Sequence, residues 1–255
     1  MVTIDLNPQV AIVTGGAGEL GRVMCRTLAA AGARVAVHYR SSEDKALRTV
    51  QEIREAGGFA LAFQADITVE ADVLRLRDEI EAEMGTPTIV VNNAVAQYAW
   101  VSVLEQSLAD YESQFQSCVI QNVLMAKAFV PGMIEKEAGG RIIAINTECA
   151  MQNFTSQSAY VSGKRGMDGV LRVLAKEIGE HQITVNQVAP GWTQSERIRA
   201  GGVEQQDGYA KNVPLKRAGT DQEIANVVLF LASHLSSYIT GAYIPVCGGN
   251  VMPTI

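Results

Sequence analysis

Cysteine and histidine are scarce in this chain, and their spacing argues against disulfide and metal supports. The four cysteines among 255 residues form no Cys-x-x-Cys pair, and a chain of this length can bury a sufficient core without disulfides. We therefore expect reduced, mostly buried thiols. The three histidines are scattered, so we predict no metal site. These residues are Cys25, Cys118, Cys149, Cys247, His38, His181 and His234.

Positive charge and long apolar runs are also in short supply. The chain has 21 lysine and arginine residues against 27 aspartate and glutamate residues, for a formal net charge of −6. An acidic balance without a basic stripe argues against a nucleic-acid partner. The first ten residues show no signal-peptide pattern, and the apolar runs are shorter than the roughly 20 residues of a membrane span. We expect a cytoplasmic protein that acts on a small molecule, without a membrane partner.

Short apolar runs that alternate with helix-length amphipathic segments dominate what is present. The runs are rich in valine, isoleucine and alanine and are apolar on both alternating faces, as in strands covered by helices on both sides. Segments such as 43–56 and 71–84 carry apolar residues at helical spacing. The pattern predicts one α/β domain over residues 1–255, a doubly wound, Rossmann-like parallel sheet of about seven strands flanked by helices. The predicted strands are 10–14, 34–39, 61–65, 88–91, 141–145, 184–188 and 243–246.

A glycine-rich turn follows the first predicted strand. The segment Thr14-Gly-Gly-Ala-Gly-Glu-Leu-Gly21 ends the strand, and a helix is expected to begin near Arg22. Such a turn brings the backbone close to a pyrophosphate, which the N–H groups and dipole of the helix N-terminus then stabilise. In this strand-to-helix context the pattern indicates a dinucleotide site.

The end of the second predicted strand carries an arginine where an NAD-binding chain would place an acidic residue. An acidic side chain there would accept the ribose hydroxyls of NAD, but none occurs before Glu43. Arg40 and Ser41 instead suit a 2′-phosphate. We therefore favour NADP(H), with NAD(H) as the alternative and a solvated Arg40 as the purely structural interpretation.

Together with motifs farther along the chain, this turn resembles the phosphate loop of the short-chain dehydrogenase/reductase family. Gly15, Gly18 and Gly21 fit the TGxxGxxG spacing of the extended branch, while Glu19 stands where members of this length have glycine. A carboxylate would repel a pyrophosphate, so we expect the Glu19 side chain to point away from it. The resemblance implies cofactor contacts by these residues: Gly15, Gly18, Glu19, Leu20, Asp66, Ile67, Asn93, Ala94, Pro190, Gly191, Thr193 and Ser195. The resemblance implies that Asp66 and Ile67 meet the adenine ring and that Thr193 and Ser195 contact the nicotinamide carboxamide. Asp66 is also expected to cap the following helix.

The motif Tyr160-Val-Ser-Gly-Lys164 is expected on a helix over residues 157–179. Positions four apart share a helical face, and a nearby ammonium lowers the pKa of a phenol, so the pair is a plausible general acid/base. The resemblance implies that both residues also contact the cofactor. It places Thr147 at the family's catalytic serine and Cys118 at its catalytic asparagine; Asn146, Ser156 and Ser158 are alternatives for the hydroxyl. A thiol cannot replace an amide's hydrogen bonds, and a small buried residue is the simpler interpretation of Cys118. The nearby polar residues Gln121 and Asn122 are expected on other faces of the same helix.

The motifs together predict an NADP(H)-dependent oxidoreductase that interconverts a carbonyl, such as a ketone or oxo-acyl group, and an alcohol. Departures at Glu19, Val95, Cys118 and Thr147 motivate an alternative, a cofactor-binding protein with weak or no redox activity. A second alternative keeps the fold but catalyses a non-redox reaction. Residues 192–212 are expected to form a substrate lid, in which Trp192 either lines the pocket or only packs. The resemblance implies a homo-oligomer, a dimer or tetramer.

Overall fold

A parallel sheet of seven strands forms the centre of the protein. The computed structural model describes residues 3–137, 139–195 and 207–252. The strands follow the order β3-β2-β1-β4-β5-β6-β9, with every neighbouring pair parallel. This confirms the predicted Rossmann-like, doubly wound sheet. The strands are β1 (Val10–Val13), β2 (Arg34–Tyr39), β3 (Phe59–Gln64), β4 (Ile89–Asn92), β5 (Gly140–Ile145), β6 (Ile183–Pro190) and β9 (Tyr243–Val246).

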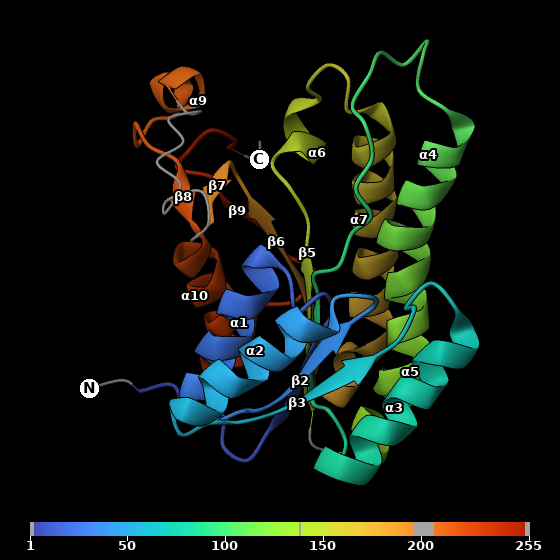
Figure 1. Ribbon diagram of the computed structural model, residues 1–255, viewed down its shortest axis with the longest axis vertical. Helices are drawn as coiled ribbons and strands as arrows, with labels where there is room; N and C mark the ends of the chain where they lie inside the picture. The colour runs from blue at the N-terminus through green and yellow to red at the C-terminus, as the bar shows by residue number, and fades with distance from the viewer. Residues whose placement is uncertain (1–2, 138, 196–206, 253–255) are drawn as a thin grey trace.

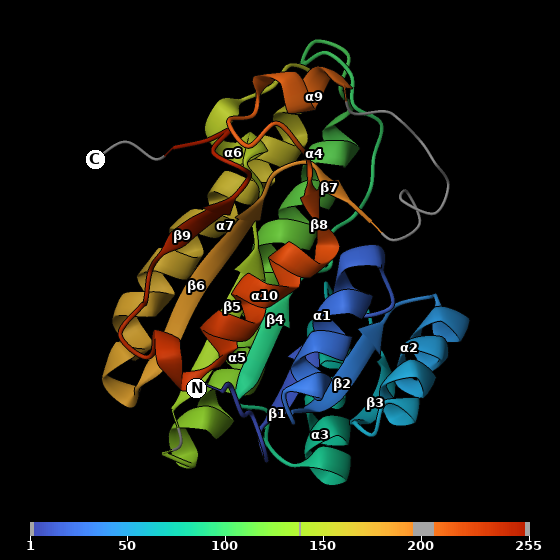
Figure 2. The ribbon, with the colours of Figure 1, turned by 90° about the vertical axis from the view of Figure 1, so that its left-hand side faces the viewer.

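Helices cover both faces of this sheet (Figures 1 and 2). One core contains α1 (Glu19–Ala30), α2 (Glu43–Glu55) and α10 (Asp221–Ala232), and the other contains α3 (Glu70–Met84), α5 (Gln121–Glu135) and α7 (Ser158–Ile178). Successive strand residues contribute to opposite cores; Val13 packs in the first and Ile12 in the second. Burial on both faces is why apolar residues occupy successive positions in these strands.

The strand order reverses at β1, which lies between β2 and β4. In open parallel sheets the ligand crevice forms at the carboxyl ends of the strands beside such a reversal. The loops after β1, β2, β4 and β5 therefore converge on one end of the sheet, and they carry most of the predicted site residues.

A long helical stretch along one side of the sheet contains a π-helical segment. It consists of α4 (Leu108–Gln114), the π-helix η1 (Phe115–Ile120) and α5. Within the described residues, Leu108–Glu135 is the one helix long and apolar enough to cross a membrane, and 56% of its most apolar window is buried inside the protein. Its packing against α3 and α7 accounts for this apolar character.

Several boundaries differ from the sequence expectations. Helix α1 begins at Glu19 rather than near Arg22, because the chain turns at Gly18, whose extended backbone (φ −80°, ψ 174°) forms the N-cap. Glu19 thereby enters the first helical turn, where a carboxylate is favoured by the helix dipole. A two-stranded pair also follows β6, formed by β7 (Thr193–Gln194) and β8 (Gly219–Thr220). Short helices, α6 (Cys149–Gln152) and α9 (Asp207–Asn212), complete this end.

Candidate active site

A cleft of about 620 Å³ opens at the carboxyl end of the sheet. Every predicted site residue lines it except Cys118 and Ser195. The structure thus brings together residues that follow six different strands and residues of α7. The predicted residues in its walls are Gly15, Gly18, Glu19, Leu20, Arg40, Ser41, Asp66, Ile67, Asn93, Ala94, Thr147, Tyr160, Lys164, Pro190, Gly191 and Thr193.

The glycine turn forms the floor of the cleft. Gly15 adopts φ +63°, and a Cβ there would stand 3.1 Å from the Ala94 Cα; a Cβ at Gly21 would collide with the Gly15 carbonyl oxygen. No side chain caps the N-terminus of α1. A backbone cradle without side chains, leading to an uncapped helix end, suits a pyrophosphate. Glu19 is exposed at the rim of the cleft; the orientation of its carboxylate toward a bound pyrophosphate stays a prediction.

Two polar side chains hold this turn against the loop after β4. The Thr14 hydroxyl accepts hydrogen bonds from the backbone N–H groups of Asn93 (2.9 Å) and Ala94 (3.1 Å). The Asn93 amide donates to the carbonyls of Thr14 (3.0 Å) and Gly15 (3.3 Å). Asn93 therefore supports the shape of the cofactor loop through its side chain, and its predicted cofactor contact stays a prediction.

His38 is a site residue that the sequence analysis missed. Its ring is 2% exposed and lines the cleft. Nδ1 accepts a hydrogen bond from the Gly15 N–H at 3.0 Å. Nε2 therefore carries the ring proton and donates a hydrogen bond to the Ala65 carbonyl at 3.1 Å. Burial lowers the pKa of His38 from 6.5 to about 4, so the ring is neutral and available as an acceptor near pH 7.

Positive charge gathers where the cleft passes the end of β2. Arg40, Ser41 and Lys45 all line it, while the Glu43 carboxylate accepts a hydrogen bond from the Tyr39 hydroxyl at 3.2 Å. Lys45, in the first turn of α2, was not anticipated. The charge of a lysine in the first turn of a helix opposes the helix dipole and is unfavourable there. This unfavourable placement was the sequence signal for a functional role of Lys45.

Asp66 does not cap α3 as expected. The helix begins at Glu70 with Val69 as its N-cap, and Asp66 instead forms a turn, accepting from the Thr68 N–H at 3.0 Å and its hydroxyl at 2.6 Å. Partial burial raises the pKa of this carboxyl, but the Thr68 hydrogen bonds and the charge of Arg40 outweigh burial and lower it overall. Asp66 is therefore an anion fixed at the cleft wall, as the predicted adenine contact requires.

Tyr160 and Lys164 extend from α7 into the cleft beside Thr147, which follows β5. The Thr147 side chain hydrogen-bonds to the Tyr160 phenol. The Lys164 Nζ lies 5.8 Å from the Tyr160 ring centroid and donates to the Ile145 carbonyl at 2.6 Å. The structure therefore brings the three residues together, as predicted. Of the alternatives, Asn146 uses its amide within the protein, and Ser158 bonds to Tyr111 at 2.7 Å.

The pKa of the Tyr160 phenol is raised overall, whereas a lowered value was expected from the neighbouring Lys164. Burial raises the pKa of Tyr160 well above its ordinary value, and the Thr147 hydrogen bond offsets only part of this. Burial also lowers the pKa of Lys164, because a dry environment penalises its ammonium form. Tyr160 is therefore a protonated phenol near pH 7.

Cys118 lies behind the cleft rather than in its wall. It is 0% exposed, its thiol faces the Gln114 side-chain oxygen at 4.0 Å, and it packs against Gly163 of α7. The π-helix directs Ser117 and Gln121 into the cleft instead, which corrects the expectation that Gln121 faces elsewhere. The Ser117 hydroxyl and the Gln121 side-chain oxygen are buried without a hydrogen-bond partner in the described chain. The position of Cys118 favours its interpretation as a small buried residue.

A second cavity of about 610 Å³ adjoins the cleft. Thr147, Tyr160, Pro190, Gly191 and Thr193 belong to the walls of both. The remaining walls are largely aromatic: Trp100 stacks near Tyr160 (ring centroids 6.2 Å apart, 25° between planes), and Trp192 lies 6.3 Å from Tyr209. Trp192 therefore lines the pocket, one of the two interpretations left open. The aromatic residues in the walls are Tyr98, Trp100, Phe154, Tyr160, Trp192 and Tyr209.

Two polar residues of this second cavity were not anticipated. The Glu148 carboxylate is 3% exposed and accepts from Tyr209 of α9 and from Asn250, each at 3.0 Å. Burial raises its pKa, although these hydrogen bonds oppose the shift. Gln157 is 7% exposed, and its side-chain oxygen has no partner among the described residues. Only the ends of the predicted lid are described here; residues 196–206 lie outside the described part of the chain.

The backbone at the end of β6 forms part of the cleft wall beside Thr147. The Pro190 carbonyl accepts from the Glu148 N–H at 2.9 Å, and the Gly191 N–H donates to Val246 at 3.0 Å. Thr193 lines both cavities, whereas Ser195 is 6% exposed and lies outside the lining residues. The predicted carboxamide contact of Ser195 stays a prediction. Among the described residues, no group of three histidine, cysteine, aspartate or glutamate side chains could hold a metal ion.

This fold and site define a class of dinucleotide-dependent oxidoreductases, and comparison with known proteins identifies the family. The chain matches the family model described as Enoyl-(Acyl carrier protein) reductase over residues 15–250. It is 33% identical over 252 residues to the 3-oxoacyl-[acyl-carrier-protein] reductase FabG of Staphylococcus epidermidis, covering 95% of this chain and 98% of the relative.

Solved structures agree with this assignment. A 7α-hydroxysteroid dehydrogenase in complex with NADH and 7-oxo glycochenodeoxycholic acid has a TM-score of 0.89 and 29% identity, over 98% of this chain and 97% of that chain. A blue fluorescent protein from a metagenomic library in complex with NADPH has a TM-score of 0.88 and 32% identity, over 97% and 100%. The chain belongs to the short-chain dehydrogenase/reductase family. It is an NAD(P)-dependent enzyme that acts on CH–OH and C=O groups.

Proposed function

We propose that this enzyme uses NADPH to reduce the carbonyl group of a bulky, largely apolar ketone or oxo-acyl compound. One observation carries the proposal: Thr147 and Tyr160 belong to the walls of both the cofactor cleft and the aromatic cavity. A carbonyl held in that cavity has a phenol and a hydroxyl beside it at the point where the cleft begins. Reactions between two bound partners need this proximity.

The residues of the cleft fit a dinucleotide phosphate. The turn between Gly15 and Gly21 would hold the pyrophosphate, Asp66 the adenine, and Arg40 with Ser41 the 2′-phosphate. Arg40, Ser41 and Lys45 supply hydrogen-bond donors and positive charge at one end of the cleft, which supports NADP(H) over NAD(H). When bound, the nicotinamide supplies the hydride that is added to the carbonyl carbon.

The side chains of this chain handle the proton. Tyr160 donates its phenolic proton to the substrate oxygen as that oxygen gains charge, and Thr147 donates a hydrogen bond that orients the same oxygen. The resulting phenolate is stabilised by Lys164, whose Nζ lies 5.8 Å from the centre of the phenol ring, and it regains a proton from solvent. Burial raises the pKa of the Tyr160 phenol, so the residue is protonated near pH 7 and carries the proton that reduction of a carbonyl needs.

The shape of the second cavity supports a bulky substrate. Its volume, about 610 Å³, falls within the range of small-molecule sites. Six aromatic side chains line the apolar part of the wall, and Gln157 and Glu148 supply polar groups. Flat or extended apolar carbonyl compounds fit such a cavity better than small polar ones.

Reductase assays with a matched pair of tyrosine variants test the proposal. Purified protein is mixed with NADPH and a panel of ring ketones and oxo-acyl thioesters, and oxidation of the cofactor is followed by its absorbance. Tyr160→Phe should lower kcat by about 10²- to 10⁴-fold, while Tyr238→Phe, at a fully exposed tyrosine, should leave it unchanged. Calorimetric binding of NADPH without turnover of any carbonyl would favour a cofactor-binding protein, and full activity in Tyr160→Phe would refute the assigned proton donor.

Homo-oligomerisation remains part of the proposal. Leu108 of α4 and Phe115 of η1 are 78% and 50% exposed. They lie about two helical turns apart, and exposed apolar side chains that share one face of a helix favour a protein interface. Light scattering of the purified protein should give the mass of a dimer or tetramer.

A further inference from the structure

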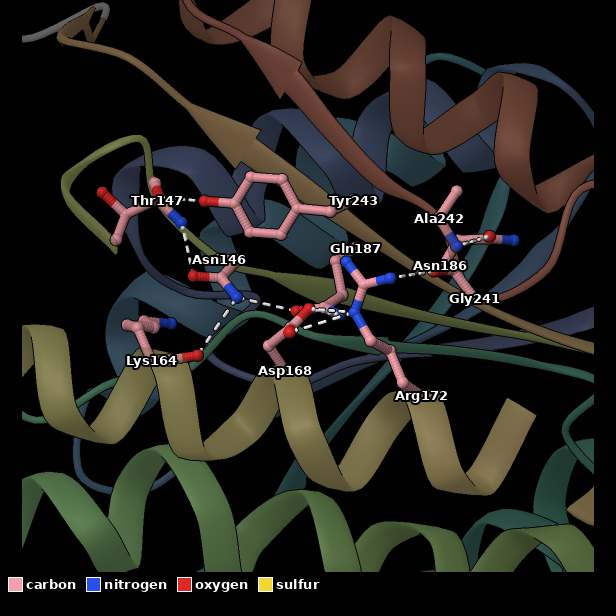
Figure 3. A network of polar contacts seen from close by, with 10 residues as sticks. All are labelled: Asn146, Thr147, Lys164, Asp168, Arg172, Asn186, Gln187, Gly241, Ala242 and Tyr243. Atoms are coloured by element: carbon pink, nitrogen blue, oxygen red, sulfur yellow. Dashed lines mark hydrogen bonds and ion pairs between the residues drawn. The ribbon is translucent and has the colours of Figure 1, made fainter. Parts of the chain in front are cut away.

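A buried chain of amide side chains connects the surface of α7 to the backbone of Thr147 (Figure 3). Asp168 of α7 accepts a hydrogen bond from the Gln187 side chain of β6 at 2.7 Å. The Gln187 side-chain oxygen accepts from the Asn146 amide at 2.7 Å. The Asn146 oxygen accepts from the Thr147 N–H at 2.9 Å. Four residues from three elements thus form one continuous chain that ends at a proposed catalytic residue.

The groups at the two ends fix which atom donates and which accepts in every hydrogen bond between them. A carboxylate can only accept, so Gln187 must turn its nitrogen toward Asp168 and its oxygen toward Asn146. Asn146 must then turn its nitrogen toward Gln187 and its oxygen toward Thr147, whose N–H can only donate. The outer end is held by Arg172, whose Nε lies 2.8 and 3.0 Å from the two Asp168 oxygens. An amide flip at either residue would bring like groups together.

The chain also connects Thr147 with the helix that carries the other proposed catalytic residues. The Asn146 nitrogen donates a second hydrogen bond to the Lys164 carbonyl at 3.2 Å. On its other side, the Thr147 carbonyl accepts from the Tyr243 hydroxyl of β9. Both backbone groups of Thr147 are therefore held by side chains, the N–H by the preceding residue and the carbonyl by a residue of β9. Because threonine is β-branched and its χ1 is restricted, the position of its backbone determines the position of its hydroxyl.

Packing alone does not require polar side chains at the two buried amide positions. Asn146 and Gln187 are 2% and 1% exposed, and apolar side chains of similar volume would fill the same space without desolvating two amides. A fully paired polar chain instead specifies one arrangement of the groups around it. Here the groups whose arrangement must be fixed are Thr147, Tyr160 and Lys164.

We propose that Asp168, Gln187 and Asn146 form a positioning relay that fixes the Thr147 hydroxyl against Tyr160. Asp168 and Gln187 line neither the cofactor cleft nor the aromatic cavity, so they act on the reaction only through the position of Thr147. The inference rests on the proposed function for the role of Thr147, but the hydrogen bond to its N–H can be measured without turnover.

The first experiment replaces the central amide. Gln187→Met keeps the volume and leaves Asn146 without its acceptor. The expected result is a fall in kcat of about 10- to 100-fold with the NADPH KM within about twofold, and about tenfold faster hydrogen exchange of the Thr147 N–H measured by NMR. The matched control is Thr184→Val, an isosteric polar-to-apolar change on the same strand at a residue that is 6% exposed and whose hydroxyl has no partner among the described residues. It should change neither value.

A pair of variants at the outer end separates the relay from a general loss of stability. Asp168→Asn and Asp168→Leu both remove the ion pair with Arg172, but only asparagine keeps an acceptor for Gln187. We expect Asp168→Leu to lower kcat about tenfold and Asp168→Asn to stay within about threefold of the parent enzyme. Because Asp168 is partly exposed, we expect both variants to fold. They therefore test the relay even if Gln187→Met does not fold.

The possible outcomes are distinct. Equal kcat in the two Asp168 variants, or unchanged Thr147 exchange in Gln187→Met, would overturn the relay. A parent enzyme that binds NADPH but reduces no carbonyl would instead refute the proposed function, while the exchange of the Thr147 N–H would still decide whether the relay holds that residue.

Discussion

His38 makes the stability of the cofactor loop depend on pH in a way that can be calculated from its surroundings. The neutral ring accepts the Gly15 N–H through Nδ1 and donates to Ala65 through Nε2. Protonation would replace the acceptor with a second donor facing an N–H. Burial adds the cost of placing a charge in a dry site, which lowers the pKa of His38 from 6.5 to about 4.

The sign of the effect follows from proton binding. Because the pKa is lower in the folded state, the unfolded chain binds more protons at acidic pH. The contribution of His38 to stability is complete above about pH 6.5 and is lost progressively as the pH falls toward 4. For these two pKa values, the free energy of unfolding falls by about 2 kcal/mol between roughly pH 7.5 and 5 through this residue alone.

Urea unfolding of the parent protein and His38→Gln at several pH values measures this contribution. Glutamine keeps a side-chain acceptor for Gly15 but does not titrate, so other groups that titrate in this range cancel in the comparison. The parent should lose about 2 kcal/mol more than the variant over that pH interval, and its affinity for NADPH should fall in parallel. The same pH dependence in both proteins would refute the assignment of a neutral, accepting His38.

Two further predictions concern the ends of the cleft. Arg40→Asp should reduce the ratio of kcat/KM for NADPH over NADH by at least about tenfold, because a carboxylate repels the 2′-phosphate and accepts ribose hydroxyls; an unchanged ratio would remove Arg40 from cofactor selection. Thr147→Val, which keeps the shape and removes the hydroxyl, should lower kcat by about 10²- to 10³-fold, while Thr147→Ser should retain most activity. Equal rates for these two variants would show that the hydroxyl does not orient the substrate.

The sheet and the glycine turn could be predicted because their causes are local. Strands buried on both faces must be apolar at successive positions, as Ile12 and Val13 illustrate by packing in opposite cores. The turn needs glycine where backbone segments approach closely, as at Gly21 against the Gly15 carbonyl. Such requirements leave a signature within a few residues, and parallel topology then gathers the strand ends at one edge.

The π-helix could not be predicted because its causes lie elsewhere in the chain. Its geometry places Ser117 and Gln121 in the cleft and Cys118 behind it. Contacts from other loops hold it: the Gln114 amide donates to the Ala96 carbonyl at 3.0 Å, and the Gln121 amide donates to Ala94 at 2.7 Å. A helical wheel assumes regular α-helical spacing and cannot represent the extra residue in a π-helical turn, so it assigned Gln121 to the wrong face.

The start of the catalytic helix shows the same dependence on distant residues. An N-cap residue usually accepts hydrogen bonds from the first-turn N–H groups through its side chain, but Gln157 of α7 does not. The Tyr98 hydroxyl, 62 residues away in the chain, accepts the Tyr160 N–H at 2.8 Å instead. Because Tyr98 also lines the aromatic cavity, the wall of that cavity itself stabilises the turn that carries Tyr160, and the Gln157 side-chain oxygen has no partner among the described residues. No rule confined to neighbouring residues assigns either role.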